Sequence, residues 1–174
     1  DGATATAKVT VKGMREAHEW SFRNHVMPVL TKATCNSGAC HGALAGKGGF
    51  RLSLLGYDVE GDFQTITRGV RGRRVDLAQP AHSLLLTKPT AATKHKGGKL
   101  IDARSRDYRV LAEWVAAGAP GPKEEERRVR RIEVLPELSQ LKKGDTQQLM
   151  VRAHYSDGRV EDVTAWSKFT SSNE

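Results

Sequence analysis

The stretch Cys35-Asn36-Ser37-Gly38-Ala39-Cys40-His41 holds both cysteines of the 174-residue chain and a histidine directly after the second one. Two thiols followed at once by an imidazole are the groups that attach a c-type haem. Each thiol adds to one vinyl group of the porphyrin, and the histidine becomes the proximal iron ligand. The motif therefore predicts one haem c, bound covalently by Cys35 and Cys40, with His41 as an axial ligand of the iron.

The spacing in this motif is unusual, because four residues separate the cysteines where two are usual. The loop between them must bulge, which Gly38 and the small Ser37 and Ala39 allow. Three other interpretations stay open. The cysteines could form a short-range disulfide, they could be half of a zinc site with His41 and a distant ligand, or they could be two buried thiols beside an ordinary histidine.

Composition limits the class of protein. With 38% hydrophobic and 28% charged residues, the chain can bury one core of about 100 residues plus something smaller. We expect no membrane span, because no apolar run approaches about 20 residues. The start at Asp1 lacks the features of a signal peptide, so we expect any export signal to have been removed or to lie outside this sequence. Covalent haem attachment would place the protein outside the cytoplasm, in the periplasm or at the cell surface.

The net charge of +8 and a cluster of arginines between glycines raise the question of nucleic-acid binding. Only 6% of the residues are aromatic and none is interleaved with these arginines, as a stacking platform would need, so we expect no nucleic-acid partner. We expect a solvated basic loop, in which Arg73 and Arg74 are candidates to bind the haem propionates through their planar guanidinium groups. The cluster consists of Arg68, Arg71, Arg73 and Arg74.

Apolar spacing predicts three helices. The first covers residues 15–33, with a kink or restart at Pro28; the second begins at Pro80 and ends near Lys88; the third is capped by Ser105 and stops at Gly118. Residues 42–49 are expected to form a loop, residues 50–54 a short extended segment, and the region up to residue 80 has no strong period. These elements predict a mainly α, small cytochrome c-like haem domain of class I type over residues 15–122.

A β segment follows Pro122 and a run of charged residues. Alternating apolar residues and a hairpin turn at Asp157-Gly158 predict strands within residues 129–174, about three where an immunoglobulin-like sandwich needs about seven. Residues 1–13 contain one clean alternating strand. We interpret the two pieces as the N-terminal part of one immunoglobulin-like unit and the last strand of a preceding one. Their apolar faces should pack on the haem domain, on each other, or on a second molecule through a β-edge dimer.

Nearly the whole chain resembles a known family. Five motifs resemble the cytochrome c-like domain of large planctomycete multidomain proteins, where it lies between bacterial immunoglobulin-like (group 2) domains. The tail, in Gly144-Asp-Thr-Gln-Gln-Leu, Tyr155-Ser-Asp-Gly, Asp162-Val-Thr and Ser171-Ser-Asn, resembles the first half of such a domain. The resemblance implies covalent haem and an extracytoplasmic location. The haem-domain motifs are Phe22-Arg-Asn-His-Val-Met-Pro-Val-Leu-Thr-Lys, Cys35 to Gly42, Gly49-Phe-Arg-Leu-Ser-Leu-Leu-Gly-Tyr-Asp, Ser83-Leu-Leu-Leu and Trp114-Val-Ala-Ala-Gly-Ala-Pro.

The second axial ligand cannot be the methionine that many small cytochromes use. Met14, Met27 and Met150 all lie outside the segment between the haem motif and residue 120. His95 lies in a loop ten residues before Ser105, where a distal ligand is expected, so we favour it; His82 and a vacant or water-bound site are the alternatives.

Two imidazole ligands would close the iron to substrates, so we expect an electron carrier rather than an enzyme, acting with an unidentified redox partner. Two other classes stay open. One is a surface or structural binding module in which Cys35 and Cys40 form a disulfide. The other is a haem sensor or enzyme with an open distal site.

Overall fold

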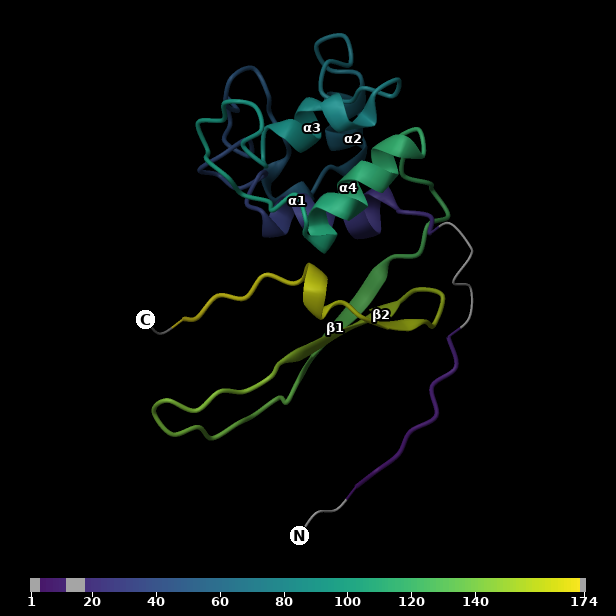
Figure 1. Cartoon of the computed structure of the whole chain (residues 1–174), viewed down its shortest axis with the longest axis vertical. Helices are drawn as coiled ribbons and strands as arrows, with labels where there is room; N and C mark the ends of the chain where they lie inside the picture. Colours follow the sequence, from purple (N-terminus) through teal and green to yellow (C-terminus); the bar gives the residue numbers. More distant parts are fainter. Residues whose placement is uncertain (1–3, 12–17, 173–174) are drawn as a thin grey trace.

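The computed structural model describes residues 4–11 and 18–172. Within these residues, four short α-helices and their connecting loops form one part of the molecule, and a three-stranded antiparallel sheet forms the other. Figure 1 shows the helices gathered above the sheet, with a short turn near residue 165 between the two. The segment 4–11 extends away from both parts.

The first helical segment begins where Ser21 caps it, because the Ser21 hydroxyl accepts a hydrogen bond from the backbone N–H of Asn24 at 2.8 Å. A π-helix, η1 (Phe22–Val26), leads directly into α1 (Met27–Lys32). Pro28 lies in the first turn of α1, where its fixed φ suits the helix, and the change from π-helix to α-helix falls directly before it. The predicted restart at Pro28 is confirmed, and the helix begins at Phe22, since residues 18–21 are not helical. Residues 15–17 of the predicted helix lie outside the described residues.

Three further helices follow. Helix α2 (Val59–Thr67) is capped by Asp58, α3 (Leu84–Thr87) follows the 3₁₀ turn η3 (Pro80–His82), and α4 (Arg106–Ala116) is capped by Ser105. The helix after Ser105 and the short helical segment after Pro80 are confirmed. Helix α2 was not predicted, although a capping aspartate followed by two acidic residues in the first turn favours a helix start.

One apolar core joins these helices. Phe22 and Trp114, both almost completely buried, pack with their ring centroids 5.4 Å apart, and Phe63 meets Phe22 edge to face at 5.3 Å. The Trp114 indole N–H donates to the Pro120 carbonyl at 3.0 Å, so its polar atom is satisfied. The first and last helices are therefore held together, and the loops that carry the candidate site lie between them.

The sheet has the strand order β1 (Val129–Leu135), β2 (Met150–Tyr155), β3 (Val160–Asp162). The predicted hairpin between β2 and β3 is confirmed, and Gly158 adopts the positive φ of 83° that its turn requires. Strand β2 buries Val151, Ala153 and Tyr155 on one face. Ile132 and Val134 stand opposite Ala153 and Val151 on β1 but stay 60% and 42% exposed.

The sheet is fastened to the helical part by the short turn η4 (Thr164–Trp166). The Trp166 ring lies 6.1 Å from Trp20 and 5.7 Å from His25, and the Arg106 guanidinium stacks over it at 4.4 Å. Lys32 Nζ donates to the Ala165 carbonyl at 2.9 Å and pairs with Asp107 at 3.0 Å. The β segment after residue 129 therefore packs on the helical part through this turn, whereas residues 4–11, which were expected to be covered as well, are exposed. β-edge dimerisation stays a prediction.

The predicted fold class is wrong. The structure is mixed, about 27% helical and 11% strand, and it is not mainly α with an immunoglobulin-like domain. The physical reason is that long stretches between the helices, such as 68–79 and 88–105, have no apolar period and fold as loops and turns. Residues 4–11 form no paired strand, and in residues 50–54 the isolated bridge from Phe50 to Lys47 is followed by a 3₁₀ turn, η2 (Leu54–Gly56).

No helix within the described residues is both long enough and apolar enough to cross a membrane.

Replacing Trp166 by alanine should loosen the sheet from the helices, because the indole joins Trp20, His25 and Arg106 across their boundary. We expect the free energy of unfolding in urea to fall by about 2 to 3 kcal/mol and the linker around residues 122–128 to become sensitive to trypsin. Phe169→Ala is the control, since Phe169 is half exposed. Equal effects of the two substitutions would contradict this role of Trp166.

Candidate functional site

The Cys35–His41 stretch folds as a compact series of backbone turns after α1. The Cys35 N–H donates to Leu30 O at 2.8 Å, the His41 N–H returns to Cys35 O at 2.9 Å, and the Gly42 N–H donates to Ser37 O at 3.0 Å. A Cβ atom at position 42 would lie 2.1 Å from the Asn36 carbonyl oxygen, so only glycine fits there. Backbone hydrogen bonds therefore fix the position of His41 relative to Cys35, and Gly42 allows the tight turn that follows.

Asn36 anchors this loop from inside, although no pattern in the sequence singles it out. Its side chain is fully buried, and its amide donates to the Thr31 hydroxyl at 2.9 Å. Its backbone carbonyl accepts the N–H of Leu55 at 3.0 Å. The loop between the cysteines is therefore held to both α1 and the segment before α2.

The two cysteines are free thiols. Burial, followed by the electrostatic influence of Cys40, raises the pKa of Cys35 to about 11, so this thiol is protonated at neutral pH. Since both cysteines are free, the disulfide alternative is not formed in this structure. Two free thiols in one loop are what thioether formation with two vinyl groups needs.

The His41 ring is oriented by a backbone acceptor. Its Nδ1 lies 3.0 Å from the Phe50 carbonyl, and since a carbonyl can only accept, Nδ1 carries the proton and Nε2 carries the lone pair. The ring centroids of His41 and Phe50 are 4.6 Å apart. Desolvation is the largest cause of a lowered pKa at His41, which favours its neutral, ligating form.

The His95 ring is also oriented by a backbone carbonyl. Its Nδ1 lies 2.9 Å from the Gly98 carbonyl, which again leaves the lone pair on Nε2. A Cβ at position 97 would lie 2.8 Å from the ring, so Gly97 makes room for it. The charge of His95 contributes to lowering the pKa of His41, which places the two imidazoles within electrostatic range. His82 is exposed, and no side-chain hydrogen bond involves it within the described residues.

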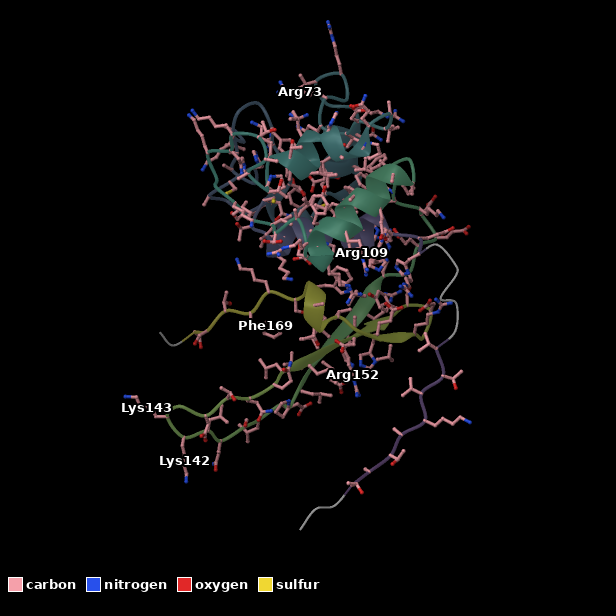
Figure 2. The ribbon with its side chains drawn as sticks, viewed as in Figure 1. Arg73, Arg109, Lys142, Lys143, Arg152 and Phe169 are labelled. Atoms are coloured by element: carbon pink, nitrogen blue, oxygen red, sulfur yellow. The ribbon has the colours of Figure 1, made fainter. Side chains whose placement is uncertain are left out.

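The two candidate arginines, Arg73 and Arg74, differ in how far they are exposed to solvent. Arg73 is exposed at the outer end of the helical part, away from the sheet (Figure 2). Arg74 is only 8% exposed, and its guanidinium donates to three backbone carbonyls and stacks on Phe50. Desolvation lowers the pKa of Arg74 from its usual value. Arg74 is therefore committed to the protein interior and is poorly placed to bind a propionate.

The expectation of a metal-binding protein needs a correction. Within residues 4–11 and 18–172, no group of three or more His, Cys, Asp and Glu side chains could hold a metal ion. The described part of the chain thus builds no metal centre from its own side chains, and the zinc interpretation of Cys35, Cys40 and His41 finds no further ligands there. Any iron at this position would need a porphyrin to supply the other donors.

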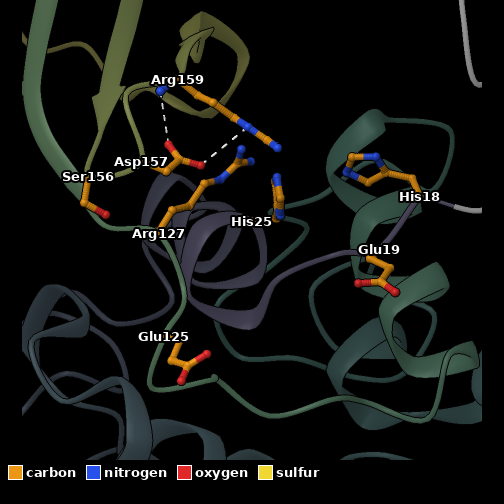
Figure 3. Close-up of a pocket in the computed structure, with 8 residues that line it drawn as sticks. All are labelled: His18, Glu19, His25, Glu125, Arg127, Ser156, Asp157 and Arg159. Atoms are coloured by element: carbon orange, nitrogen blue, oxygen red, sulfur yellow. Dashed lines mark hydrogen bonds and ion pairs between the residues drawn. The ribbon is translucent and has the colours of Figure 1, made fainter.

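A separate cavity of about 480 Å³ lies where the sheet meets the helical part. Figure 3 shows Arg127 and Arg159 beside His25, with Arg159 bonded to Asp157. Burial is the main cause that lowers the pKa of His25 to about 4, and His18, Arg127 and Arg106 lower it further. Its Nδ1 accepts the N–H of Ser21 at 3.0 Å. The lining residues are His18, Glu19, His25, Glu125, Arg127, Ser156, Asp157 and Arg159.

None of the four predicted haem residues lines this cavity or the second one, of about 500 Å³, beside the start of α4. Cys35, Cys40 and His41 lie together in one loop, and His95 approaches from another. The sequence analysis did not identify Asn36 or the Phe50 carbonyl. Any residue type supplies a backbone carbonyl, and an asparagine in a loop is usually exposed, so neither role can be recognised from the residue type.

No protein-family model, no curated protein and no solved structure matches this chain.

The stability of the fold should depend on pH through His25. Its folded pKa of about 4 lies below the usual 6.5, so the unfolded chain binds the proton more tightly and stability falls as pH drops from about 6.5 to 4. The shift sets an upper bound of about 3 kcal/mol, and we expect about 1 to 2 kcal/mol after solvent screening. Urea unfolding of His25→Asn, which keeps an acceptor for Ser21, should lose this dependence, whereas the exposed His82→Asn should retain it. An unchanged slope in His25→Asn would refute the assignment.

Proposed function

We propose that the chain is an electron-transfer unit that carries one haem c, attached through Cys35 and Cys40, with His41 as an axial iron ligand. The observation that carries the proposal is the geometry at His41. The imidazole follows two free thiols in one loop and holds its Nδ1 proton against the Phe50 carbonyl. Iron-bound histidines typically donate their other ring N–H to a carbonyl or carboxylate, which fixes the tautomer and the ring orientation.

The residues fit the group in number and chemistry. A porphyrin supplies four nitrogen donors, so the chain has to supply at most two, and His41 and His95 are two imidazoles in the same tautomer. When bound, the haem supplies an iron that changes between the ferric and ferrous states. We therefore propose His95 as the second axial ligand.

We propose that the loops at 42–49 and 91–99 move apart when the haem is attached, because the charge of His95 already acts on His41. Neither loop contains a helix or a named strand, and glycines with positive φ lie in both, Gly46, Gly48 and Gly49 in the first and Gly98 in the second, so movement costs little regular structure. The compact turn at Cys35–Gly42 would stay in place during this movement.

The cellular setting follows from the attachment chemistry. We propose an extracytoplasmic location, in the periplasm or at the cell surface, and a redox protein as partner. With both axial positions filled by imidazoles, the iron would accept and donate electrons without binding a substrate, so we propose a carrier rather than an enzyme. The resemblance to the cytochrome c-like domain of planctomycete multidomain proteins supports the same function.

Expression of the full chain with a periplasmic cytochrome maturation system should give a red protein whose mass equals the polypeptide plus one haem. The colour should survive extraction with acidified acetone, because thioether bonds are covalent. The matched control is the double variant Cys35→Ser, Cys40→Ser, which should lose its colour in the same extraction. Wild-type protein with the mass of the bare polypeptide would refute the proposal and favour a binding module.

Replacing His95 by alanine in the haem-loaded chain should convert a low-spin absorption spectrum into a high-spin or water-ligated one and allow carbon monoxide to bind the reduced iron. His82→Ala should leave the spectrum unchanged. The reverse result would assign the ligand to His82, and carbon monoxide binding by the wild type would favour a sensor or enzyme with an open site.

A further inference from the structure

We propose that Arg74 is a positioning residue for His41, because its buried guanidinium fixes the Phe50 carbonyl that orients the imidazole. The inference deepens the proposed function, in which His41 is the iron ligand. The contacts that carry it belong to the chain itself and exist whether or not haem is attached.

Arg74 is bound on several sides. Its Nη1 donates to the carbonyls of Thr65 at 3.2 Å and Gly69 at 3.1 Å, and its Nη2 donates to the carbonyl of Gly49 at 3.1 Å. The guanidinium carbon lies 4.2 Å from the centroid of the Phe50 ring. No carboxylate pairs with Arg74 within the described residues, so carbonyl dipoles and the ring face stabilise its charge.

The Phe50 carbonyl depends on this clamp. It accepts two hydrogen bonds, from the Lys47 N–H at 2.9 Å and from His41 Nδ1 at 3.0 Å. The residues before it form the isolated bridge between Lys47 and Phe50, but Gly46, Gly48 and Gly49 around this bridge all adopt positive φ, so the loop has little regular structure of its own. Arg74 therefore holds the loop at two points next to this carbonyl, the Gly49 carbonyl and the Phe50 ring.

A lysine cannot reproduce this arrangement. The guanidinium is planar, so it can donate to three carbonyls in different directions while its face stacks on the Phe50 ring. The ammonium of a lysine is a point charge on a flexible stem and has no planar face to stack. The charge alone is therefore not enough, and the shape of the guanidinium is what positions Phe50.

Two measurements on the full chain without haem test the inference. In the wild-type protein, the two Nη groups of Arg74 should give separate ¹⁵N NMR signals, because the clamp blocks rotation about the Nε–Cζ bond. In the same protein, long-range ¹H–¹⁵N correlations at a fixed alkaline pH should show His41 in one tautomer, with the proton on Nδ1. A freely rotating Arg74 guanidinium would overturn the proposal without any variant.

Arg74→Gln should then shift the ratio of the two neutral His41 tautomers by about fivefold, the change that follows from losing one hydrogen bond. Arg74→Lys should give a similar shift although it keeps the charge. Arg73→Gln is the adjacent exposed control, and Val110→Ala lowers stability from a fully buried position on α4. An unchanged tautomer in folded Arg74→Gln or Arg74→Lys, or an equal shift in Val110→Ala, would overturn the positioning role. Haem attachment is measured separately, so the two proposals can fail independently.

Discussion

The contact between Phe22 and Trp114 is the constraint on which the rest of the helical part depends. These two rings join the first helical segment to the last helix, about 90 residues apart in the chain, and both are almost fully buried. Between these two elements the chain contains the short helices α2 and α3, two 3₁₀ turns and long irregular loops. Such loops cannot supply a core of their own, so their positions follow from what they attach to on the joined helices.

Local signals in the sequence predicted the elements better than the fold class. Ser105 and Gly118 bounded the last helix because caps and stops are properties of single residues, and Pro28 marked the restart for the same reason. The overall class was wrong because the loops between helices contain few periodic apolar residues, and their extent follows from tertiary contacts. Residues 4–11 illustrate the same limit, since their clean alternation gave no paired strand without a neighbour to bond.

In the candidate site, too, some residues could be predicted from the sequence and others could not. Cys35, Cys40 and His41 could be named from their chemistry alone, and His95 from its place in the chain. The role of Arg74 could not be read, because a basic residue in an arginine-rich loop is usually solvated, whereas this one points inward to three carbonyls. Its neighbour Arg73 is exposed. One residue in a charged cluster thus has an interior role that only the folded structure distinguishes.

The burial of Arg74 also separates the charges of this protein into two groups. Ion pairs such as Lys99 with Asp102 have half-exposed side chains, so dissolved salt surrounds them and weakens their attraction. Mobile ions approach a guanidinium that is 8% exposed far less closely, so salt weakens its field on the His41 loop much less. Ionic strength therefore acts mainly on the exposed charges of this strongly basic chain, while the buried charge beside the His41 loop is comparatively insensitive to it.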